Sequence, residues 1–62
     1  MKVTATKSGK VIYCHKYKDY KKAYVEFYKL CDGIEPVWHF DSNSLVKKII
    51  ATKGDYCVTL DR

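Results

Sequence analysis

The stretch from Asp19 to Gly33 limits the fold of this chain more than any other part of the sequence. At about 100° per residue, its apolar side chains fall on one side of a helix and its charged side chains on the other. The apolar arc contains Tyr17, Tyr20, Ala23, Tyr24, Phe27, Tyr28, Leu30 and Cys31. Asp19 suits the N-cap and Gly33 suits the C-terminal stop. We therefore predict one amphipathic helix, with Phe27 fully buried at the centre of its apolar side.

The polar side of this helix carries lysines around a single valine. The set is Lys18, Lys21, Lys22, Val25 and Lys29. We expect the four lysines to be exposed, and nothing local requires an apolar side chain at Val25. An exposed valine is common on protein surfaces, so a purely solvated face is the alternative to a contact surface.

Charge is distributed unevenly over the 62 residues, whose net charge is +5. Residues 1–31 contain eight lysines and two acids, a net charge of +6, whereas residues 32–62 contain four basic and five acidic residues. The first half is therefore suited to an acidic protein surface or another polyanion.

Four further segments have the pattern of β-strands. Lys2–Thr6 and Lys10–Tyr17 flank a glycine-containing turn, which predicts a hairpin. Apolar residues on both faces of the second strand predict a central place in a sheet. Val37–Phe40 follows a proline, and Asp55–Leu60 places Tyr56, Val58 and Leu60 on one side.

Residues 42–53 fit two structures. As a helix, they would begin after an N-cap at Asp41 and place Leu45, Val46, Ile49 and Ile50 on one face. As a strand, their β-branched residues would pair with the last strand across Lys53-Gly54. We prefer the helix because the adjacent Lys47 and Lys48 interrupt the two-residue alternation.

The predicted fold is therefore a single α+β domain spanning residues 1–62. Its order is ββαβαβ, with ββαβββ as the alternative, and its sheet is antiparallel or mixed and packed on one main amphipathic helix. A composition of 47% hydrophobic and 31% charged residues is typical of a globular chain. No long apolar run follows Met1, so we expect a cytoplasmic protein that does not contact a membrane.

Residues suited to catalysis or metal binding are scattered through the chain. They are Cys14, His15, Cys31, His39 and Cys57. Cys14 and His15 are neighbours on a predicted strand, so their side chains point to opposite faces and cannot act as nucleophile and base. No close ligand pair such as C-x₂₋₄-C is present. We expect reduced, buried cysteines in a protein that is not an enzyme and has no cofactor and no metal.

Two kinds of binding function remain. A nucleic-acid-binding protein would contact phosphates with little sequence specificity through Lys10, Lys16, Lys18, Lys21, Lys22 and Lys29, with Tyr13 or Tyr17 stacking on a base. A protein-interaction module would occupy the acidic surface of a protein or protein–nucleic-acid complex, or a second copy of itself in a homodimer. Small phage-encoded antagonists of host nuclease or polymerase complexes have this general size and composition.

We predict the interaction module, an inhibitor or adaptor, and keep nucleic-acid binding as the alternative. The predicted partner-binding residues are Lys18, Lys21, Lys22, Val25 and Lys29. If this face is only solvated, the sheet around Tyr13, Trp38 or Tyr56 is the next place to look.

Overall fold

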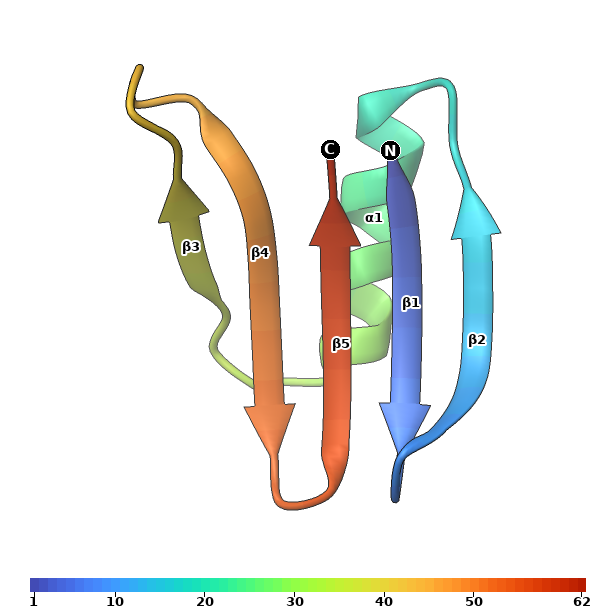
Figure 1. The fold of residues 1–62 in the computed structure, drawn as a ribbon. Coiled ribbons are helices and arrows are strands. Elements are labelled where there is room, and N and C mark those ends of the chain that lie inside the picture. Colours follow the sequence, from blue (N-terminus) through green and yellow to red (C-terminus); the bar gives the residue numbers. More distant parts are fainter.

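Five strands and one helix form a two-layer structure (Figure 1) in the computed structural model, which describes residues 1–62. The elements in chain order are β1 (Lys2–Lys7), β2 (Lys10–Lys16), α1 (Tyr20–Cys31), β3 (Val37–Phe40), β4 (Val46–Lys53) and β5 (Tyr56–Asp61). The strands form one sheet in the order β2-β1-β5-β4-β3, and every neighbouring pair is antiparallel. The α+β class predicted from the sequence agrees with this architecture.

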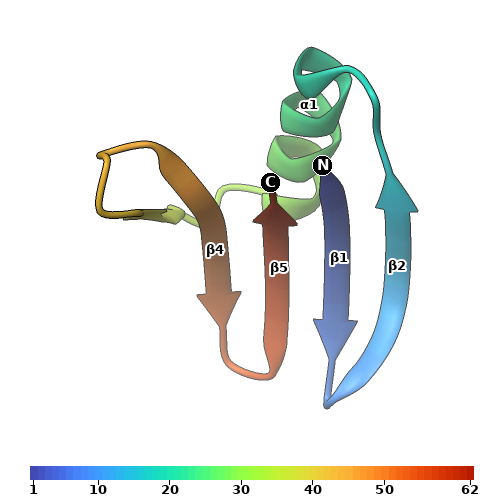
Figure 2. The same cartoon turned by 45° about the horizontal axis from the view of Figure 1, so that its top comes forward.

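The helix lies against one face of the sheet, over β1 and β5 (Figures 1 and 2). Its residues Ala23, Phe27 and Cys31 are buried there, as the helical periodicity predicts. The sheet contributes the rest of the core, which is Val3, Ala5, Ile49, Ala51, Val58 and Leu60. Alternate residues of each strand point to the same face, so the remaining residues of β1, β4 and β5 face away from the helix. No second layer covers that face.

Two tight turns close the hairpins at one end of the sheet. Ser8 and Gly9 have φ values of 53° and 78°, which is the conformation of a two-residue type I′ turn. The second turn, between β4 and β5, starts at Gly54 with φ of 61°. The Ser8 N–H donates to the Asp55 carbonyl at 3.0 Å, and the Ser8 hydroxyl donates to the Asp55 carboxylate. These bonds tie the two turns together.

The preferred helix over residues 42–53 is wrong, because Val46–Lys53 forms strand β4. This strand pairs with β3 on one side and β5 on the other, which satisfies its backbone and suits its β-branched residues. The Asp41 carboxylate caps a turn instead of a helix: it accepts hydrogen bonds from the N–H groups of Asn43 at 2.8 Å and Leu45 at 3.0 Å. The observed order is therefore ββαβββ.

The predicted central position of β2 is also wrong. β2 is an edge strand, and all its residues except Tyr13 are exposed. Val11 is 64% exposed and Ile12 is 57% exposed. The helix covers mainly β1 and β5, so Val11 and Ile12 of β2 have no layer to pack against, and only Tyr13 of this strand packs against the core.

The first and last residues of the chain lie side by side at the other end of the sheet (Figure 1). Met1 is held there by two backbone bonds with Tyr17, and the Arg62 N–H donates to the Lys47 carbonyl at 3.4 Å. Helix α1 has only 12 residues, and the structure contains no helix long and apolar enough to cross a bilayer.

Candidate interaction surface

The outward side of α1 presents the predicted lysines to solvent. The Asp19 carboxylate accepts a hydrogen bond from the Lys21 N–H at 2.9 Å and caps the helix, so the lysine positions that follow are fixed by helical geometry. Lys21, Lys22 and Lys29 are all exposed, as predicted. Lys18 is exposed too, but it precedes the N-cap and lies in the β2–α1 connection rather than on the helix.

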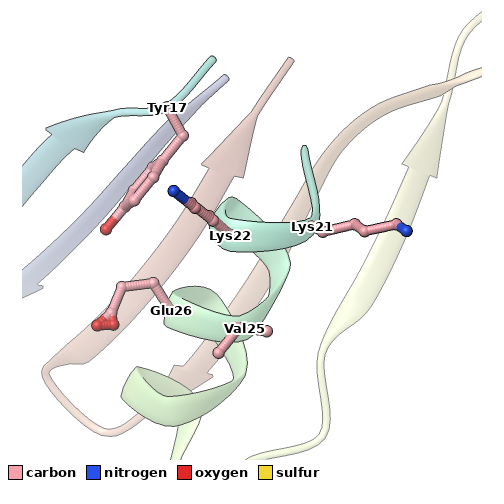
Figure 3. Close-up of a pocket in the computed structure, with 5 residues that line it drawn as sticks. All are labelled: Tyr17, Lys21, Lys22, Val25 and Glu26. Atoms are coloured by element: carbon pink, nitrogen blue, oxygen red, sulfur yellow. The ribbon is translucent and has the colours of Figure 1, made fainter. Parts of the chain in front are cut away.

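Val25 lies in the middle of this surface and is 57% exposed. A shallow hollow of about 360 Å³ runs beside it, lined by Tyr17, Lys21, Lys22, Val25 and Glu26 (Figure 3). Lys22 and Glu26 lie on the side of the helix that faces Tyr17, whereas Lys21 extends the opposite way (Figure 3). The surface therefore has an apolar centre with cations on both sides and a single acid.

Tyr17 forms the wall of this hollow and is a fixed, neutral group. Its hydroxyl is hydrogen-bonded to the Tyr13 hydroxyl, which raises the pKa of Tyr17 to about 12. Its ring also packs against the His15 ring in an edge-type arrangement, at a centroid distance of 4.6 Å. Tyr17 can therefore offer a ring and a phenol to a ligand, but it carries no charge at neutral pH.

The tyrosines of the helix do not all belong to the core. Tyr20 is 56% exposed and Tyr28 is 46% exposed, whereas Tyr24 is half-buried. Tyr24 stacks on Trp38 of β3, with 6.1 Å between ring centroids and an interplanar angle of 20°. The sequence pattern placed all three rings in the apolar arc, but α1 packs mainly on β1 and β5, so the flank toward β3 stays partly open.

In the alternative site on the sheet, Trp38 is 40% exposed, whereas the two tyrosines do not form an open aromatic surface. Tyr13, Trp38 and Tyr56 pair with Ala5, Ile49 and Lys7, all on the helix side of the sheet. Tyr13 and Tyr56 are half-buried, and the Tyr56 hydroxyl donates to the Leu30 carbonyl at 2.6 Å. Neither ring offers a face on the uncovered side of the sheet for a base to stack on.

The cysteines occupy three different environments. Cys31 is buried, and burial raises the pKa of its thiol. Cys57 is half-buried, and Cys14 is exposed on β2, which corrects the prediction that all three are buried. Cys14 is opposite Thr4 and His15 is opposite Val3, so their side chains point to different faces, as predicted. The structure contains no group of three or more His, Cys, Asp or Glu side chains that could hold a metal ion.

A second basic region was missed in the sequence. Lys2, Lys16, Lys18 and Arg62 surround the end of the sheet where the chain begins and finishes. The hairpin pattern does not contain this signal, because a turn at Ser8-Gly9 alone would place His15 opposite Lys2. The bulge between Ala5 and Thr6 shifts the register by one residue and brings Lys16 there instead. The approach of Arg62 depends on the pairing of β1 with β5, which no local pattern encodes.

Comparison of the chain with protein-family models, with curated proteins and with solved structures found no match.

Proposed function

We propose that this protein is a non-enzymatic interaction module that binds an acidic surface of a partner protein or protein–nucleic-acid complex. In this proposal the outward side of α1 is the contact surface, and the protein acts as an inhibitor or adaptor by occupying its partner. The observation that carries the proposal is Val25, an exposed apolar side chain with Lys21, Lys22 and Lys29 around it.

The lysines on this surface are available to a partner. None of the hydrogen bonds made by side chains in the structure uses a lysine ammonium group. Cations at the rim of an interface attract an acidic partner and set the association rate, while a central apolar residue adds contact area. Val25 and the ring of Tyr17 would supply that apolar contact, and the lysines would supply the charge complementarity.

The test compares two triple variants with the same change in charge. Lys21→Glu/Lys22→Glu/Lys29→Glu reverses the helix surface, and Lys7→Glu/Lys10→Glu/Lys53→Glu reverses three exposed lysines near the turns at the far end of the sheet. Both should stay folded, because exposed charges contribute only about 0–1 kcal/mol each. Partner capture from host lysate should weaken by about tenfold or more for the helix variant alone.

Two further measurements connect the loss to this surface. Val25→Asp should weaken capture without unfolding the domain, since Val25 is outside the core. Carbodiimide, which joins amines to carboxylates without a spacer, should link Lys21, Lys22 or Lys29 to an acidic residue of the captured protein. Equal binding by the two triple variants would refute this assignment. So would cross-links that join the partner only to lysines of this protein other than Lys21, Lys22 and Lys29.

A further inference from the structure

The end of the sheet opposite the two tight turns is strongly basic, and we name Lys2, Lys16, Lys18 and Arg62 the basic end. Two neighbouring hollows, of about 600 and 470 Å³, open there and share Met1, Lys18 and Arg62 as lining residues. Asp61 is the one acid among the residues that line them. The four side-chain cations therefore exceed the local negative charge by three.

The register of the strands aligns several charged side chains in a row across the sheet. Lys16, Lys2, Asp61 and Lys48 are directly opposite one another across β2, β1, β5 and β4, on the face away from the helix. At about 4.8 Å per strand, the line is about 14 Å long. Lys2 has the acid Asp61 opposite it on β5, whereas Lys16 on the edge strand has only Lys2 opposite it, a like-charge pair that destabilises a sheet. A linear polyanion would relieve this repulsion.

An exposed aromatic ring lies beside the other two cations of the basic end, on the helix side of the molecule. Tyr20 and Tyr24 line the second hollow together with Lys18 and Arg62. The Tyr20 ring is held edge-on against Tyr24, with 6.3 Å between centroids, and Tyr24 is in turn stacked on Trp38. Tyr20 is 56% exposed, so a fixed ring beside a cationic surface remains open to a flat ligand.

We propose that the basic end binds single-stranded nucleic acid, with phosphates on Lys2, Lys16 and Lys18 and an unpaired base against Tyr20. Positive charge along the backbone together with an aromatic stacking surface is the usual combination for single strands. The cations contact phosphates and not base edges, so the site has little sequence preference. Tyr17 lines hollows at both places, but Lys2, Lys16, Lys18 and Tyr20 are outside the set Lys21, Lys22, Val25 and Lys29 that tests the protein partner, so the two proposals can fail independently.

The test measures fluorescence anisotropy of a labelled 12-nucleotide oligo(dT) with the complete chain at several salt concentrations. Lys2→Gln/Lys16→Gln/Lys18→Gln should lower the slope of log K against log salt by about 2, since each phosphate contact contributes about 0.7. At ~0.1 M salt this corresponds to roughly 100-fold weaker binding. The matched control is Lys7→Gln/Lys10→Gln/Lys53→Gln, which removes the same charge at the opposite end and should change affinity far less.

A second pair of variants tests the stacking contact. Tyr20→Ala should weaken binding by about tenfold, whereas Tyr28→Ala, two turns further along α1, should leave it unchanged. Circular dichroism checks that each variant is folded. Absence of binding at low salt, equal losses in the two lysine variants, or an unchanged affinity for Tyr20→Ala would overturn the proposal. Equally strong competition by polyglutamate would instead assign the basic end to an acidic protein.

Discussion

Phe27 has the largest side chain of the fully buried core residues, and it lies where α1 meets the sheet. It is at the centre of the arc that the helical period defines, and this position was predicted from the sequence. The residues one turn before and after it, Ala23 and Cys31, are small and buried as well. Phe27 therefore supplies most of the helix volume that fills the space over β1 and β5.

Phe27→Ala should destabilise the protein by about 3–5 kcal/mol, because it removes a large buried ring and leaves a cavity. Domains of this size bury only about 60% of their unfolded surface, and total stabilities start near 5 kcal/mol, so the variant should be close to unfolded at 25 °C. Urea denaturation followed by circular dichroism measures the difference. Tyr28→Ala is the control: its ring is 46% exposed and touches Phe27 edge-on, so its loss should be much smaller.

For single residues of the helix, the helical periodicity separates buried from exposed positions but does not give the width of the buried arc. Ala23, Phe27, Lys21, Lys22 and Lys29 all have the predicted burial. Tyr20 and Tyr28 do not, because the width of the buried arc depends on how many strands lie under the helix. That number depends on long-range strand pairing, which a single helix pattern cannot contain.

At the scale of elements, segment 41–53 shows why local patterns can favour the wrong structure. An acidic residue followed by apolar residues three and four positions apart suits a helix, and the Asp41 carboxylate caps an Asx turn equally well. Two partner strands, β3 and β5, decide the outcome by pairing with both edges of β4. The short strand Val37–Phe40 was predicted with its observed bounds, since the preceding proline limits where it can begin.

The link between the two turns gives a prediction of pH dependence. The Ser8 hydroxyl donates a hydrogen bond to the Asp55 carboxylate and lowers the pKa of Asp55. A lowered folded-state pKa stabilises the fold above the unfolded value of about 3.9, and this stabilisation is lost as the pH falls through the folded value. Asp55→Asn should therefore be less stable than the natural protein at pH 7, and the difference should shrink below about pH 3.9.

Urea denaturation at a series of pH values measures this difference. Glu35→Gln is the control, because Glu35 is exposed and takes no part in the side-chain hydrogen bonds. The unfolding free energy of Glu35→Gln should be close to that of the natural protein both at pH 7 and below about pH 3.9. A stability gap for Asp55→Asn that stays constant down to acidic pH would mean that the charge of Asp55 does not stabilise the tie between the turns.

Across the whole molecule, the net charge is +5, and strand pairing in the sheet brings together lysines that are far apart in the sequence. Two cross-strand pairs, Lys2–Lys16 and Lys7–Lys10, join like charges directly. The lysines of α1 could be assigned from the sequence because one helix carries them. The basic end could not, since it combines the two ends of the first hairpin with the β2–α1 connection and Arg62.

This charge should make the stability of the fold depend on salt. The screening length falls from about 30 Å at 0.01 M to about 10 Å at 0.1 M salt, so repulsion among the lysines weakens over that range and Tm should rise. Lys10→Glu replaces the like-charge pair across the first turn by an opposite-charge pair. A gain of about 0.5 kcal/mol would raise Tm by about 2–4 °C at low salt, and the salt dependence should become flatter.

Lys53→Glu separates this local effect from the change in net charge, because Lys53 is opposite Tyr56 and not opposite another lysine. It lowers the net charge by the same amount as Lys10→Glu but should raise Tm less at low salt. Thermal melts followed by circular dichroism at 0.01 and 0.2 M NaCl compare the natural protein with both variants. Equal increases in Tm for Lys10→Glu and Lys53→Glu would show that the overall charge, and not the local pair, determines the effect. If instead the Tm of the natural protein does not rise with salt, its lysine pairs are already well solvated. In the second case the repulsion between Lys2 and Lys16 would no longer support an anion at the basic end.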